Sequence, residues 1–70
     1  MRDLGRFREA AEKFLREKYG DCHIEFSEVY VFGGLVEVSG VLRLRGERAA
    51  RRFTVKLDSQ SLLVKGFGLR

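Results

Sequence analysis

The sequence predicts an α+β domain in which one N-terminal helix packs on a four-stranded antiparallel meander (α-β-β-β-β), in two layers. Residues 3–19 place apolar side chains at steps of three and four, which is the period of an amphipathic helix. From residue 22 onward, apolar and polar residues alternate in short runs that are typical of strands. Gly33-Gly34 and two polar segments separate these runs. A chain of 70 residues is expected to form one domain, residues 1–70.

Composition excludes several classes of protein. Hydrophobic residues make up 44% of the chain and proline is absent, so the sequence does not resemble a disordered segment. No apolar run approaches the roughly 20 residues that a membrane span needs, and the charged N-terminus does not resemble a signal peptide. Cys22 is the only cysteine, so an intramolecular disulfide is excluded and a cytoplasmic location is expected.

The helix is predicted over residues 3–19. Asp3 is a candidate N-cap, and Gly20 is suited to end the helix. Glu9 and Lys13, like Glu12 and Arg16, are spaced as i,i+4 ion pairs, which favours a solvated polar face over a binding surface. The apolar stripe comprises Leu4, Phe7, Ala10, Ala11, Phe14 and Leu15.

The first hairpin is predicted from strands 22–32 and 35–45 around the two glycines. This turn places Val31 opposite Val36. Continued without interruption, the same register would send the apolar residues before position 27 to the wrong face, so a one-residue bulge at Ser27 or Glu28 is expected. With that bulge the further pairs are Val29 with Val38, Phe26 with Gly40, Ile24 with Leu42, and Cys22 with Leu44.

Two further strands are predicted over residues 51–57 and 62–67. A four-residue loop, "ERAA", sets the second hairpin, and the turn-rich segment "DSQS" sets the third. The expected pairs are Leu44 with Phe53, Leu42 with Val55, Gly40 with Leu57, Leu62 with Leu57, and Val64 with Val55.

The apolar partners in this register all fall on one face, which is expected to pack against the helix. A helix on a curved four-stranded meander resembles the arrangement in cystatins, and this likeness concerns the fold and implies no function. The expected core comprises Leu4, Phe7, Ala11, Phe14, Leu15, Ile24, Phe26, Val29, Val31, Val36, Val38, Leu42, Leu44, Phe53, Val55, Leu57, Leu62 and Val64.

The second face of the sheet is expected to carry apolar residues that nothing in the fold covers. A solvated antiparallel face normally alternates with polar residues, and a contiguous apolar patch usually marks an interface. We therefore expect a homodimer, formed by sheet-to-sheet packing or by pairing of strand edges. The alternative is that the last strand twists away or that the chain ends cover the patch. The predicted interface residues are Tyr30, Phe32, Leu35, Val41, Leu63 and Phe67, and Leu69 is expected to point outward beside them.

Positive charge is concentrated in residues 41–57, which hold six basic residues and one acidic residue. The predicted register sets Arg45 opposite Arg52, an unfavourable pair that Asp21, Glu47 or a bound phosphate is expected to offset. The basic side chains are Arg43, Arg45, Arg48, Arg51, Arg52 and Lys56.

Three interpretations of this stretch remain open: the solvated side of a hairpin, a nucleic-acid-binding surface, and a surface for an acidic protein. No RNP segment, GXXG loop, zinc-finger spacing or helix-turn-helix accompanies the charge. A net charge of only +4 favours the solvated hairpin.

Catalytic and metal chemistry find little support in the sequence. Cys22 and His23 are neighbours on a strand, so their side chains are expected on opposite faces, and this geometry disfavours a thiolate–imidazole dyad. Asp21, His23 and Glu25 share a face, but one histidine with two carboxylates is a poor zinc site. We therefore expect a non-catalytic interaction module with no cofactor and no metal.

Overall fold

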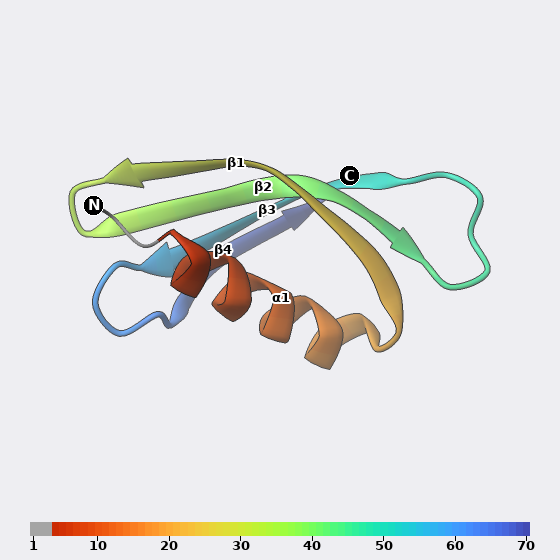
Figure 1. Ribbon diagram of the computed structural model, residues 1–70, viewed down its shortest axis with the longest axis horizontal. Coiled ribbons are helices and arrows are strands. Elements are labelled where there is room, and N and C mark those ends of the chain that lie inside the picture. Colours follow the sequence, from red (N-terminus) through yellow and green to blue (C-terminus); the bar gives the residue numbers. More distant parts are fainter. Residues whose placement is uncertain (1–3) are drawn as a thin grey trace.

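The computed structural model describes residues 4–70 and places one helix against one side of a four-stranded sheet (Figure 1). All neighbouring strands are antiparallel and follow chain order, which confirms the predicted α+β arrangement. The elements are α1 (Gly5–Tyr19), β1 (Cys22–Phe32), β2 (Leu35–Leu44), β3 (Arg51–Asp58) and β4 (Val64–Leu69).

Helix α1 ends at Gly20, as its sequence predicts. Gly20 has φ 75°, and its backbone N–H donates to the Arg16 carbonyl oxygen at 2.8 Å. Leu4 occupies the N-cap position and makes no side-chain capping bond. The expected cap Asp3 lies outside the described residues. Ala11 and Leu15 are fully buried, so the apolar stripe does face the sheet.

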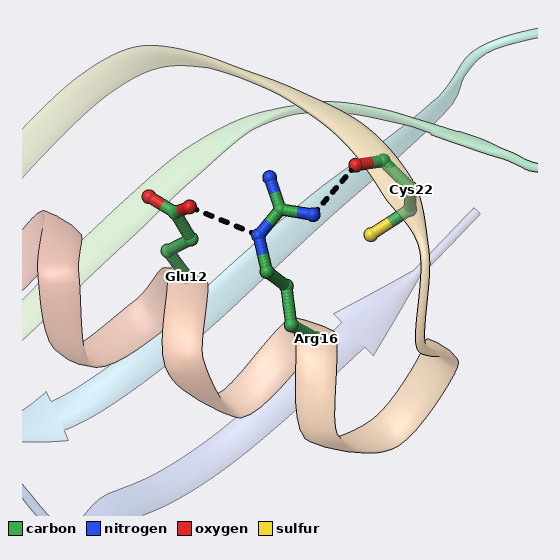
Figure 2. Close-up of polar contacts among 3 residues, drawn as sticks. All are labelled: Glu12, Arg16 and Cys22. Carbon is green, nitrogen blue, oxygen red and sulfur yellow. Dashed lines mark hydrogen bonds and ion pairs between the residues drawn. The ribbon is translucent and has the colours of Figure 1, made fainter.

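The Arg16 side chain joins the helix to the start of β1 (Figure 2). Its Nε donates to Glu12 at 2.9 Å, and its Nη1 donates to the Cys22 carbonyl oxygen at 2.9 Å. The predicted Glu12–Arg16 ion pair is therefore confirmed, whereas the predicted Glu9–Lys13 pair does not form among the described residues. The hydrogen bond to Glu12 also raises the pKa of Arg16. One guanidinium thus fixes the turn that leads from the helix into the sheet.

The β1–β2 hairpin has the predicted register throughout. Val31 pairs with Val36, and the register shifts between Phe26 and Glu28, so Ser27 is the extra residue of the expected bulge. Gly33 takes φ 59°, a conformation that few L-residues adopt and that a two-residue hairpin turn requires.

The predicted β2–β3 register is wrong by four residues. Gly40 pairs with Phe53 instead of Leu57, and Val36 takes Leu57 as its partner. The connecting loop is longer than "ERAA", because pairing ends at Leu42–Arg51. A shift by an even number of residues leaves every side chain on its predicted face. The observed register pairs the buried side chains of β3, Phe53, Val55 and Leu57, with buried residues of β2, Gly40, Val38 and Val36.

The predicted β3–β4 register is also wrong. The Asp58 carboxylate accepts hydrogen bonds from the backbone N–H groups of Gln60 and Ser61, and Leu62 takes φ 65°. This turn extends the loop through Leu63, so β4 begins at Val64, which pairs with Leu57. Leu62 therefore belongs to the loop and not to a strand.

The core lies between α1 and the middle strands β2 and β3. Three predicted core residues fall outside it: Leu4 and Leu62 are partly exposed, and Val31, beside the hairpin turn, is 37% exposed. Residues that were not in the predicted core also pack against it, among them Tyr19, Phe67 and Leu69. The fully or almost fully buried side chains are Ala11, Leu15, Val36, Val38, Leu42, Phe53, Val55 and Leu57.

Candidate functional site

The candidate site is the face of the sheet that α1 does not cover, which we call the open face. Val36 and Val38 point toward the helix, so Glu37 and Ser39 between them point to the open face. The pairings then define two rows across the four strands. One row is Tyr30, Glu37, Lys56 and Gly66, and the next is Glu28, Ser39, Thr54 and Gly68.

Aromatic side chains are exposed at the end of the open face near the β1–β2 turn. Tyr30 is 44% exposed and Phe32 is 58% exposed, and their ring centroids lie 6.1 Å apart. Leu35, the partner of Phe32, is partly buried beside them. We call Tyr30, Phe32 and Leu35 the aromatic tip. The structure thus brings together three of the predicted interface residues.

The other predicted interface residues lie elsewhere. Val41 is on the open face but near its far end, between Glu25 and Arg52. Leu63 is 64% exposed in the β3–β4 loop, and a hydrogen bond from Ser59 N–H to the Gly34 carbonyl oxygen joins this loop to the β1–β2 turn beside the aromatic tip.

Phe67 and Leu69 are on the helix side of the sheet, which corrects their prediction as outward-facing residues. The register shifts between Lys56 and Leu57 because Lys65 is an extra residue in β4. The residues after it therefore change face. The Phe67 ring meets Phe14 edge-to-face at 5.2 Å, and the strand instead presents the two glycines Gly66 and Gly68 to the open face.

The basic residues of positions 41–57 divide into those that form an ion pair and those that do not. Arg45 lies 3.7 Å from Asp21, as the sequence suggested, and Arg51 pairs with Glu47 at 3.2 Å. In contrast, four residues make no ion pair within the described part of the chain. These are Arg43, Arg48, Arg52 and Lys56.

The predicted opposition of Arg45 and Arg52 does not occur. Arg52 pairs with Val41, and pairing between β2 and β3 stops before Arg45 is reached. The neighbour of Arg52 on the other side is Arg70, whose backbone N–H donates to the Arg52 carbonyl oxygen at 2.8 Å. The structure thus removes one like-charge pair and places a different arginine beside Arg52.

A groove of about 720 Å³ crosses the open face from the middle of β1 over β2 and β3 to β4. The floor of the groove is low, because Ser39 and Thr54 have small side chains and the two glycines of β4 have none. Charged residues border it on both sides: Glu28, Glu37, Arg52, Lys56 and Arg70. Sequence reasoning missed this groove because it depends on the β3–β4 register. The alternation of glycine with Phe67 and Leu69 was the one available signal.

Groups that could perform chemistry are separated or exposed. Cys22 is buried on the helix side, whereas His23 is exposed and lies 3.2 Å from the Glu25 carboxylate. The Tyr30 hydroxyl donates to Glu28, which raises the pKa of Tyr30. Within residues 4–70, no three or more His, Cys, Asp and Glu side chains are grouped to hold a metal ion.

No protein-family model matches the sequence, and neither a curated protein nor a solved structure matches it. The described helix is not long and apolar enough to cross a membrane.

Proposed function

We propose that this chain is a small non-catalytic interaction module that forms a homodimer through the open face of its sheet. One observation carries the proposal: the helix covers one face of the sheet, and the other face exposes Tyr30 and Phe32 side by side. Aromatic residues are enriched at protein interfaces because they bury a large apolar area with few rotatable bonds.

The small size of the chain supports the same proposal. A domain of about 70 residues buries only about 60% of its unfolded surface, and oligomerisation is a common source of further stability. Packing two open faces together would form a second apolar layer at the aromatic tip. The single cysteine is a buried thiol, which fits a reducing compartment, and we propose a cytoplasmic location.

Light scattering behind a sizing column tests the homodimer. At tens of micromolar protein, a range in which a moderate interface is populated, we expect the mass of a dimer. Phe32→Glu places a charge in the aromatic tip and should shift the protein to monomer while the helical circular dichroism stays unchanged. Ala49→Glu adds the same charge in the exposed β2–β3 loop and should leave the dimer intact. A monomeric wild-type protein at these concentrations contradicts the proposal.

A nucleic-acid-binding surface is the second candidate function. Arg43, Arg52 and Lys56 on the open face make no ion pair with the described residues, so their charges are available to phosphates. A gel shift with a single-stranded oligonucleotide should then weaken steeply with salt and disappear in Arg43→Glu/Arg52→Glu. An unchanged shift in this double variant contradicts the assignment. Salt-sensitive binding to an acidic protein without binding to the oligonucleotide would favour an acidic partner.

A further inference from the structure

We propose a specific geometry for the homodimer, which rests on the proposed function. Two copies pack open face to open face about a twofold axis. The axis lies between the two sheets, runs parallel to the strands, and passes over the space between β2 and β3. In this arrangement Glu37 of each copy faces the partner's Lys56, and Tyr30 of each copy lies over the partner's Gly66 and Gly68.

The row of residues across the sheet defines this axis. Tyr30 pairs with Glu37, Glu37 with Lys56, and Lys56 with Gly66. A twofold axis between Glu37 and Lys56 exchanges β2 with β3 and β1 with β4, and it keeps each residue at its own level along the strands. The two ends of the row therefore meet each other across the interface, as do its two middle residues. The Tyr30 hydroxyl donates to Glu28 in the next row, so each ring lies between the levels of the partner's Gly66 and Gly68.

The shapes of the two ends of the row are complementary. Tyr30 is a large, exposed side chain on the first strand, and Gly66 and Gly68 leave the last strand without side chains on the same face. The groove of about 720 Å³ lies over these glycines and extends to Thr54. An aromatic residue that enters a pocket on its partner is the usual anchor of a tight interface. Only a second copy brings this ring to these glycines, because β2 and β3 separate β1 from β4 within one chain.

Charge on the open face is divided in the way that the axis requires. Glu28 and Glu37 border the groove from β1 and β2, whereas Arg52, Lys56 and Arg70 border it from β3 and the chain end. Exchanging the two halves places the acidic side of one copy over the basic side of the other. Neither Glu37 nor Lys56 makes an ion pair among the described residues, although the two are cross-strand partners on β2 and β3.

Two charged residues, Asp58 and Arg43, do not follow this separation of acidic from basic strands. Both lie outside the two rows that begin at Tyr30 and Glu28. Asp58 is on β3 near the aromatic tip, but its carboxylate already accepts hydrogen bonds from Gln60 and Ser61. Arg43 is on β2 opposite His23, beyond the last paired residue of β3. The central rows, where the two sheets approach most closely, therefore carry the complementary pattern.

Charge exchange tests this geometry directly. Glu37→Lys and Lys56→Glu each place like charges across the interface, and each variant alone should associate at least about tenfold more weakly than wild type. An equimolar mixture of the two should form a heterodimer at the wild-type concentration. One chain then presents lysine at both positions, and these two side chains face the two glutamates of the other chain. Light scattering behind a sizing column measures both results, and far-UV circular dichroism checks that each single variant is folded.

The outcomes separate this inference from the proposed function. A monomeric wild-type protein overturns both. A dimeric wild type whose two charge variants remain monomeric when mixed overturns the geometry and leaves the homodimer standing. Dimeric single variants also overturn the geometry, because the proposed charges would then not meet.

A second variant tests the groove without a change of charge. Gly66→Leu should weaken the dimer by about tenfold or more, since the new side chain occupies the space for the partner's Tyr30. The fold should tolerate it, because a Cβ at position 66 would meet only the Lys56 side chain at ordinary contact distance, 3.5 Å or more. Ala50→Leu in the exposed loop is the control. Wild-type association of Gly66→Leu contradicts the proposed geometry.

Discussion

The backbone of Gly40 packs directly against Phe26, its partner across β1 and β2. A Cβ built on Gly40 would lie 2.9 Å from the Phe26 Cα and 3.0 Å from the Phe53 ring, and it would overlap the Glu25 carbonyl oxygen. Phe26 and Phe53 also meet edge-to-face, with ring centroids 6.0 Å apart. The bulge at Ser27 and the missing side chain of Gly40 together allow β1 to bend toward the core at this point.

Gly40→Ala should destabilise the fold by about 2 kcal/mol or more, because backbone atoms on β1 have no room to retreat from the new methyl group. Urea unfolding measured by circular dichroism gives the difference. Gly34→Ala is the matched control, since a Cβ there meets nothing within 4 Å and Gly34 does not require a positive φ. Equal stabilities of the two variants would contradict the close approach at Gly40.

Phe67→Ala and Phe32→Ala should differ strongly in stability. Phe67 packs against Phe14 and Tyr19, so its truncation should cost about 3 kcal/mol. Phe32 is mostly exposed in the monomer, so its truncation should cost less than about 1 kcal/mol at concentrations too low for association. Urea unfolding at low micromolar protein compares the two. If Phe32→Ala lowered the free energy of unfolding more than Phe67→Ala, the placement of Phe67 on the helix side of β4 would be contradicted.

Asp58→Ala should lower stability at neutral pH and make the protein less sensitive to acid. Hydrogen bonds from the backbone of Ser61 and of Gln60 hold the pKa of Asp58 below its ordinary value in the folded state. A depressed folded pKa stabilises the protein above the unfolded pKa of about 3.9, and this contribution is lost as pH falls through the lower folded value.

Urea unfolding of wild type and Asp58→Ala between about pH 6 and pH 2 measures this linkage. The two stabilities should differ most near pH 6 and converge toward the acid end. Glu9→Ala removes a carboxylate from the exposed surface of α1 and is the control. A difference between wild type and Asp58→Ala that stays constant with pH would mean that the carboxylate charge does not hold the β3–β4 loop.

The contrast between the first hairpin and the later ones explains how much of the fold could be predicted. The Gly33-Gly34 turn fixes β1 and β2 because a two-residue loop permits one register, and Phe26 reaches the core face only if a residue is added. The sequence does not fix the length of the β2–β3 loop around Glu47 in this way. The predicted four-residue loop and the observed longer loop put the same side chains on each face, because the two registers differ by an even number of residues.

The candidate site was predictable in part for the same reason. Tyr30, Phe32 and Leu35 belong to the hairpin with a fixed register, and they lie together where the alternation placed them. The groove depends on the extra residue Lys65 in β4. The alternation of glycine with Phe67 and Leu69 in "LLVKGFGL" hints at the two faces of this strand, but it does not identify which residue is the extra one. An odd shift of this kind reverses the face of each later residue, which is why Phe67 was assigned to the wrong side.

The sequence by itself determined the element order, the face of each side chain on β1, β2 and β3, and the end of α1 at Gly20, because these follow from local periodicity and turn chemistry. Tertiary packing decided how far the later strands slide past one another. The observed register places Phe53 opposite Gly40 and buries it under the helix, and it brings Phe67 onto Phe14. Contacts between residues distant in the chain set that choice, since only they distinguish registers that present the same faces.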